Sequence, residues 1–127
     1  MPWTLIAAVF GAIGVATGAF GAHALQGRLD EQHLEWWSKA VQYLFWHALA
    51  LLAVEPLRAR LAQAQPAAAL WAERAGWGFL FGILLFSGSL LAMALTDWRK
   101  LGMVTPLGGL GLLAGWICLA IAARSAR

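Results

Sequence analysis

Two polar side chains inside an apolar segment are the first candidates for chemistry in this chain. Tyr43 and His47 are four residues apart, so on a helix they lie one turn apart on one face, within reach of a phenol–imidazole hydrogen bond. An imidazole changes its protonation state near neutral pH, which suits a proton relay or a pore-lining group. The structural alternative is a neutral imidazole bonded to Tyr43, Ser87, Ser89 or a helix carbonyl. The sequence leaves both interpretations open.

Metal binding and catalysis are not predicted from the other reactive residues. His23 ends the first apolar segment, and in an antiparallel pair of straight helices it lies about 15 Å from His47 along the membrane normal, whereas a zinc–nitrogen bond is about 2.0–2.1 Å. The sequence has no Ser-His-Asp set, carboxylate pair, Walker loop or CxxC motif, and its single cysteine, Cys118, cannot form an internal disulfide. We expect no metal, no cofactor and no enzymatic activity.

The elements that carry these residues are four long apolar stretches. They cover residues 3–25, 36–54, 75–96 and 101–123, and each is long enough to cross a hydrocarbon core of about 30 Å as a helix. Hydrophobic residues make up 61% of the 127-residue chain and charged residues 12%, which leaves no polar shell for a soluble domain. The sequence predicts an all-α integral membrane protein, a single domain over residues 1–127 that forms an up-and-down bundle of four transmembrane helices with its termini on the same side.

The basic residues lie at the ends of these stretches, where they meet lipid headgroups, so the net charge of +3 does not indicate nucleic-acid binding. The side that carries the termini has five basic residues against four on the other. Under the positive-inside rule this favours cytoplasmic termini by a narrow margin. The five are Arg58, Arg60, Arg74, Arg124 and Arg127, and the four are Arg28, Lys39, Arg99 and Lys100.

Capping residues and prolines predict where the helices begin and end. Asp30 is placed to cap the second helix, and Pro56 predicts that this helix stops at Glu55, because a residue before proline is pushed out of the helical region. Pro66 suits the first turn of the third helix. Thr105 and the proline after it are either a cap and first residue or a kink in the fourth helix.

Small residues recur at alternating three- and four-residue steps in the first and third helices, as in a heptad seam. Lipid gives helices no hydrophobic reason to pair, so close backbone approach must hold them together. We expect both helices to lie close to a neighbour over their whole length, either each other or a second subunit. The glycines assigned to helix packing are Gly11, Gly14, Gly18, Gly21, Gly78, Gly82, Gly88, Gly108, Gly109 and Gly115.

Four motifs resemble one bacterial membrane family. They are GAFGAH (residues 18–23), QYLFWHALAL (42–51), FSGSL (86–90) and TPLGG with a later GW (105–109 and 115–116), and they are similar in type and order to domain-of-unknown-function family 423, whose animal relatives are called transmembrane protein 256. The resemblance extends nearly end to end. It implies a small four-span protein of the bacterial inner membrane and supplies no mechanism. Leu91 stands where the family usually has tyrosine.

The resemblance draws attention to polar residues that we predict to form one buried hydrogen-bonded cluster. Most motif residues are packing glycines, and the polar remainder is His23, Gln42, Tyr43, His47, Ser87, Ser89 and Thr105. Rich packing information beside few reactive groups favours a non-enzymatic structural or accessory protein, held in the lipid bilayer, that forms a homo-oligomer or joins a membrane protein partner. The alternatives are a small transporter or channel with a polar path around His47, and lipid, quinone or haem binding between subunits.

Overall fold

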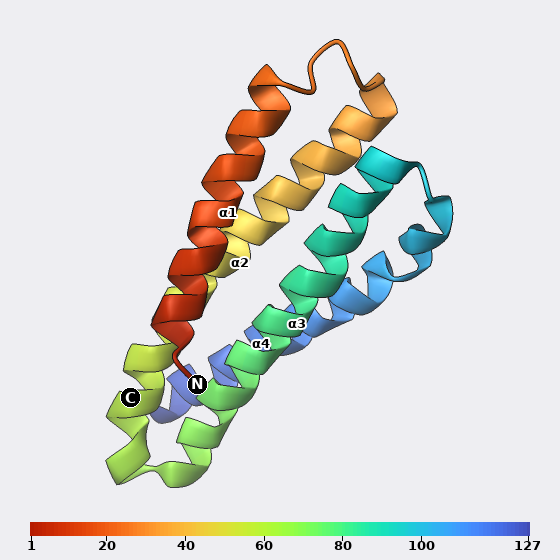
Figure 1. Ribbon diagram of the computed structural model, residues 1–127. Helices are drawn as coiled ribbons and strands as arrows, with labels where there is room; N and C mark the ends of the chain where they lie inside the picture. The colour runs from red at the N-terminus through yellow and green to blue at the C-terminus, as the bar shows by residue number, and fades with distance from the viewer.

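The computed structural model describes all 127 residues as four long helices joined by short connections, with no strand. All four helices are long and apolar enough to cross a membrane, and they alternate in direction, so the prediction of a four-helix up-and-down membrane bundle is confirmed. Both termini lie at the end of the bundle where α2 turns into α3 (Figure 1). The elements are α1 (Trp3–His23), α2 (Glu31–Ala64), α3 (Pro66–Thr96), the short 3₁₀ helix η1 (Arg99–Met103) and α4 (Thr105–Ser125).

The centre of the molecule is an antiparallel hairpin of α2 and α3, with only Gln65 between the two helices. α1 packs along α2 and α4 packs along α3, whereas α1 and α4 make hardly any contact. In Figure 1, α1 lies in front of α2 and α4 passes behind α3. The first and last helices therefore cover different faces of the hairpin.

The main core lies where α1, α2 and α3 meet. Its fully buried side chains include Trp3, Leu51, Val54, Phe79 and Ile83. Dispersion between closely packed atoms, rather than exclusion of water, is the force that holds such a core in lipid.

The helix ends confirm two predictions and correct two others. Asp30 caps α2 by accepting a hydrogen bond from the His33 amide at 2.9 Å, and Pro66 is the first residue of α3. The predicted stop at Glu55 is wrong, because α2 continues through Pro56 to Ala64. The continued helix buries Leu61 against α3 and α4, which offsets the hydrogen bond that proline cannot donate.

The predicted start of the fourth helix at Thr105 and Pro106 is confirmed and the alternative of a kink does not apply, but Thr105 is not the capping residue. It is the first residue of α4, Val104 occupies the capping position, and no side chain caps the helix. The Thr105 hydroxyl is instead engaged by α3, as the hydrogen bonds below show.

The glycine seams of α1 and α3 contact neighbouring helices over part of their length. α1 approaches α2 at Gly14 and Gly21, where an added Cβ would overlap Phe45 and Trp37. α3 crosses α4 at backbone distance, since a Cβ on Gly78 would lie 2.8 Å from the Cα of Gly115. Within the single chain the close approach does not extend over the whole of α1 and α3, because a Cβ on Gly11 or Gly88 would meet no atom within 4 Å, and the approach of a second subunit stays a prediction.

The other predicted packing glycines contact their neighbours to different degrees. A Cβ on Gly82 would overlap Leu112, one on Gly108 would overlap the backbone of Phe86, and one on Gly115 would overlap Phe79. Gly18 and Gly109 have only ordinary van der Waals neighbours, at 3.5 and 3.8 Å. Gly111, which lies outside the four motifs, completes the α3–α4 crossing.

Candidate functional site: polar groups of α2 and the groove beside α1

Ser87 and Ser89 fasten α3 to two different helices. The Ser87 hydroxyl donates to the carbonyl of Ala40 in α2 at 2.7 Å, and the Ser89 hydroxyl shares a 2.6 Å hydrogen bond with that of Thr105 in α4. Residues two apart on a helix point in nearly opposite directions, which explains the division. These hydroxyls hold helices together and leave no free polar surface between them.

His47 is hydrogen-bonded to its own helix. Its Nδ1 lies 2.6 Å from the carbonyl oxygen of Tyr43, which can only accept, so Nδ1 carries the proton of the neutral ring. The side chain is 5% exposed and lies among the rings of Tyr43, Phe79 and Trp116. Of the partners considered from the sequence, the helix carbonyl is the one used, and the phenol–imidazole hydrogen bond is not formed.

The seven predicted polar residues therefore do not form one cluster. His23 is exposed at the end of α1, and Gln42 is exposed on α2 with no hydrogen-bond partner in the chain. The remaining five divide into the Ser87 bond, the Ser89–Thr105 pair and the Tyr43–His47 turn. No group of three or more His, Cys, Asp or Glu side chains is placed to hold a metal ion.

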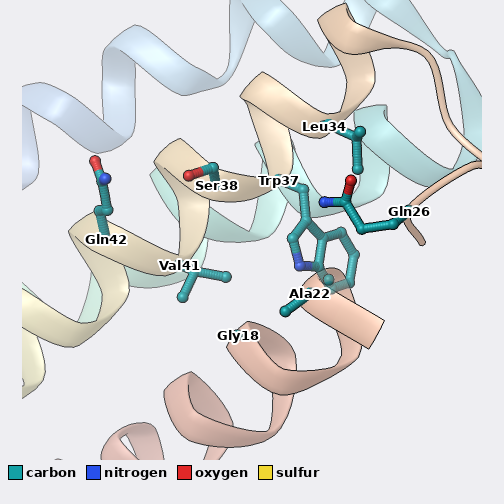
Figure 2. Close-up of a pocket in the computed structure, with 9 residues that line it drawn as sticks. Gly18, Ala22, Gln26, Leu34, Trp37, Ser38, Val41 and Gln42 are labelled. Atoms are coloured by element: carbon teal, nitrogen blue, oxygen red, sulfur yellow. The ribbon is translucent and has the colours of Figure 1, made fainter. Parts of the chain in front are cut away.

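A groove lies between α1 and α2 near the end of the bundle that carries their connecting loop (Figure 2). It has a volume of about 260 Å³. The Trp37 ring lies over the end of α1 beside Ala22, and its Nε1 donates to the carbonyl of Thr17 at 2.9 Å. The nine residues that line the groove are Gly18, Gly21, Ala22, Gln26, Leu34, Trp37, Ser38, Val41 and Gln42.

Gln42 is the most unusual residue of this groove. Figure 2 shows its carboxamide directed away from α1, at the edge of the groove. Counting from residue 45, the middle of the apolar stretch 36–54, Gln42 lies about 4.5 Å from mid-membrane. An amide without a hydrogen-bond partner is costly at that depth. Gln42 is exposed near the membrane centre with both its donors and its acceptor free.

The connector end of the bundle carries a histidine clamp that the sequence analysis did not predict. The two ring nitrogens of His33 contact Asp30 on one side and Asp97, at 2.8 Å, on the other. Asp97 is the C-terminal capping residue of α3 and has a left-handed backbone conformation. Its carboxylate also forms an ion pair with Arg99, with 3.2 Å between Oδ1 and Nε. The clamp ties the start of α2 to the end of α3, and the three-residue spacing of Asp30 and His33 was the one signal for it.

At the opposite end, a polar network joins the first three helices. Arg58 bonds Glu55 at 2.6 Å and lies 3.6 Å from Glu73, and the indole of Trp3 donates to Glu73 at 2.9 Å. The sequence signals the Glu55–Arg58 pair by its three-residue spacing, but nothing in it links these residues to Glu73 or to Trp3. The network positions the helix ends and offers no open site.

Comparisons with known proteins find one family of membrane proteins. The family model described as "Protein of unknown function (DUF423)" matches residues 17–109. UPF0382 membrane protein YwdK of Bacillus subtilis is 38% identical over 119 residues, which cover 94% of this chain and 93% of the relative.

Two staphylococcal relatives are equally similar. A UPF0382 membrane protein of Staphylococcus haemolyticus is 40% identical over 86% of this chain and 84% of its own length, and one of Staphylococcus epidermidis is 39% identical over 93% and 91%. No solved structure matches. The family match and the relatives confirm the resemblance drawn from the four motifs, and the chain belongs to the membrane protein family DUF423.

Proposed function

We propose that this protein is a non-enzymatic structural protein of the bacterial plasma (inner) membrane, and that it works by pairing with a second copy of itself along the outer flank of α2. The outer flank consists of Ser38, Gln42, Trp46 and Leu49. These residues recur every three or four positions and all are exposed.

The free carboxamide of Gln42 carries the proposal. A carboxamide has two N–H donors and an acceptor oxygen, so it is self-complementary across a twofold axis. A second copy brings the same amide to the same depth, and side-chain hydrogen bonds between membrane helices contribute about 0.6–2 kcal/mol. Gly18 and Ala22 on neighbouring α1 have small side chains, which lets a helix approach the groove closely.

The membrane and its orientation belong to the same proposal. The relatives are bacterial proteins called membrane proteins, which supports a multi-pass protein of the plasma membrane. The excess of basic residues at the α2–α3 turn and the C-terminus supports cytoplasmic termini.

Cysteine cross-linking in membranes tests the pairing. In a Cys118→Ala background, Ser38→Cys places a thiol on the outer flank, whereas Gly88→Cys places one on the exposed face of α3, where a Cβ meets no atom within 4 Å. Oxidation with copper phenanthroline is expected to give a covalent dimer with Ser38→Cys and none with Gly88→Cys. Adding Gln42→Leu to the Ser38→Cys chain should reduce the dimer severalfold. Equal yields from the two positions, or no effect of Gln42→Leu, would refute the proposal.

A further inference from the structure

Tyr43 and His47 leave one donor and one acceptor unpaired, one helical turn apart on α2. The Nδ1–H of His47 is used by the Tyr43 carbonyl, so Nε2 is the acceptor of the neutral ring, and it has no partner in the chain. The Tyr43 hydroxyl has no partner either. His47 is 5% exposed, and its Nε2 is not among the fully buried side-chain atoms without a hydrogen bond, of which Nε of Arg58 is the one.

Aromatic rings pack against the rings of Tyr43 and His47. The ring of Tyr43 stacks on Phe86 with centroids 4.3 Å apart, and the imidazole lies 5.8 Å from Phe79 and 6.0 Å from Trp116 of α4. Trp116 remains 47% exposed, so this wall is open at its edge. We call these five residues, Tyr43, His47, Phe79, Phe86 and Trp116, the aromatic flank.

The aromatic flank lies at mid-membrane beside the outer flank, since the ring of Tyr43 is 5.4 Å from that of Trp46. His47 is about 3 Å from the middle of the apolar stretch 36–54, where no bulk water satisfies polar groups. Successive helix residues are rotated by about 100°, so Tyr43 and His47 point to a different side of α2 from Gln42. The Gln42 carboxamide therefore does not itself supply partners for these two atoms.

The chemistry of the occupant follows from these groups. It must dissolve in the hydrocarbon core, present a planar face to aromatic rings, donate a hydrogen bond to Nε2 and accept one from a phenol. A hydroquinone satisfies all four requirements, since its hydroxyl groups both donate and accept. An oxidised quinone satisfies three, because its carbonyl oxygens only accept.

We propose that the aromatic flank binds the reduced ring of a lipid-soluble quinol, with one quinol hydroxyl donating to Nε2 of His47 and the oxygen of a substituent on the same ring accepting from the hydroxyl of Tyr43. The site discriminates between redox states through His47, because the oxidised ring has no hydroxyl to donate. Binding alone is proposed, with no electron transfer by the protein.

Nitrogen NMR of the full chain in lipid nanodiscs tests this proposal. The chain carries ¹⁵N-histidine, each disc of phosphatidylcholine and phosphatidylglycerol holds one copy, and decylubiquinol is added under argon. We expect the His47 Nε2 resonance to shift to lower frequency and saturate, with a much smaller shift for decylubiquinone. A single copy per disc makes the result independent of the proposed pairing.

Two variants and one control compound complete the test. Tyr43→Phe should weaken decylubiquinol binding about fivefold, the loss expected for one hydrogen bond, and His47→Phe should abolish the preference for quinol over quinone. The proposal is overturned if the Nε2 resonance of the unaltered chain does not move at saturating decylubiquinol. It is also overturned if 1-dodecanol, which has a hydroxyl but no ring, gives the same shift.

Discussion

At the residue scale, the His33 clamp couples the connector end of the bundle to pH. His33 precedes the apolar stretch that begins at Trp36, and its ring can bond two carboxylates at once only when both nitrogens carry protons. The hydrogen bond with Asp30, followed by the one with Asp97, raises the pKa of His33 above its ordinary 6.5. Hydrogen bonds from the His33 amide and ring lower the pKa of Asp30 below 3.8.

The sign of the pH dependence follows from these two shifts. A raised histidine pKa stabilises the fold below the unfolded value of 6.5, and this contribution is lost as pH rises through the folded pKa. A lowered aspartate pKa stabilises above 3.8 and is lost as pH falls through the folded pKa. The clamp is therefore strongest between these two ordinary values.

We expect the protein to resist unfolding by sodium dodecyl sulfate better at pH 5.5 than at pH 8.5, and His33→Gln to remove that difference. Circular dichroism along a detergent titration measures the midpoint at each pH. Gln32→Ala, an exposed neighbour that makes no clamp contact, is the control and should behave as the unaltered chain. A pH difference that persists in His33→Gln would assign it to another group.

At the element scale, the α3–α4 crossing should tolerate no side chain. A Cβ on Gly78 would lie 2.8 Å from the Cα and N atoms of Gly115 and 3.0 Å from the Gly111 oxygen, and these are backbone atoms that cannot rotate away. Gly78→Ala should therefore force the helices apart and cost about 1–3 kcal/mol. Gly88→Ala on the same helix meets open space and should leave the unfolding free energy nearly unchanged. Steric-trapping measurements in bicelles compare the two, and equal losses would contradict the assigned crossing.

The sequence predicts how many helices there are but not which glycines hold them together. Apolar length alone identifies a membrane span, so the four helices could be predicted from it. Local preferences of aspartate and proline at helix starts predicted the Asp30 cap and the Pro66 start. Gly11 and Gly14 belong to the same small-residue pattern in the sequence, yet only Gly14 contacts α2. The pattern covers a broader face of α1 than the face that packs against α2. The stop at Glu55 failed because local proline preference gave way to the packing of Leu61.

The sequence predicted which polar residues belong to the candidate site but not which hydrogen bonds they form. On a helix, the side chain at position i and the carbonyl at position i lie equally within reach of residue i+4, so the spacing of Tyr43 and His47 could not decide between phenol and carbonyl. The sequence also does not distinguish Ser87 from Ser89, because both are serines of one helix. They point in different directions from α3, so Ser87 bonds α2 and Ser89 bonds α4.

At the scale of the whole molecule, the central hairpin is longer than the membrane is thick. α2 has 34 residues and α3 has 31, so they measure about 51 and 46 Å against a hydrocarbon core of about 30 Å. Their apolar stretches end near the His33 clamp, so the excess lies at the α2–α3 turn. A stem of roughly residues 56–74 should therefore project into water on the side of the termini.

Thiol labelling with a membrane-impermeant maleimide checks the stem and its side together. In the Cys118→Ala background, Gln63→Cys lies in the stem, Arg28→Cys in the α1–α2 loop and Leu49→Cys within the apolar stretch 36–54 of α2. With cytoplasmic termini, intact spheroplasts should be labelled at Arg28→Cys alone, and permeabilisation should add Gln63→Cys, because the two positions lie at opposite ends of the bundle. Leu49→Cys should stay unlabelled in both states, since a thiol in hydrocarbon neither ionises nor meets the reagent. Labelling of Gln63→Cys in intact spheroplasts would reverse the orientation, and labelling of Gln63→Cys and Arg28→Cys from the same side would contradict the up-and-down path of the helices.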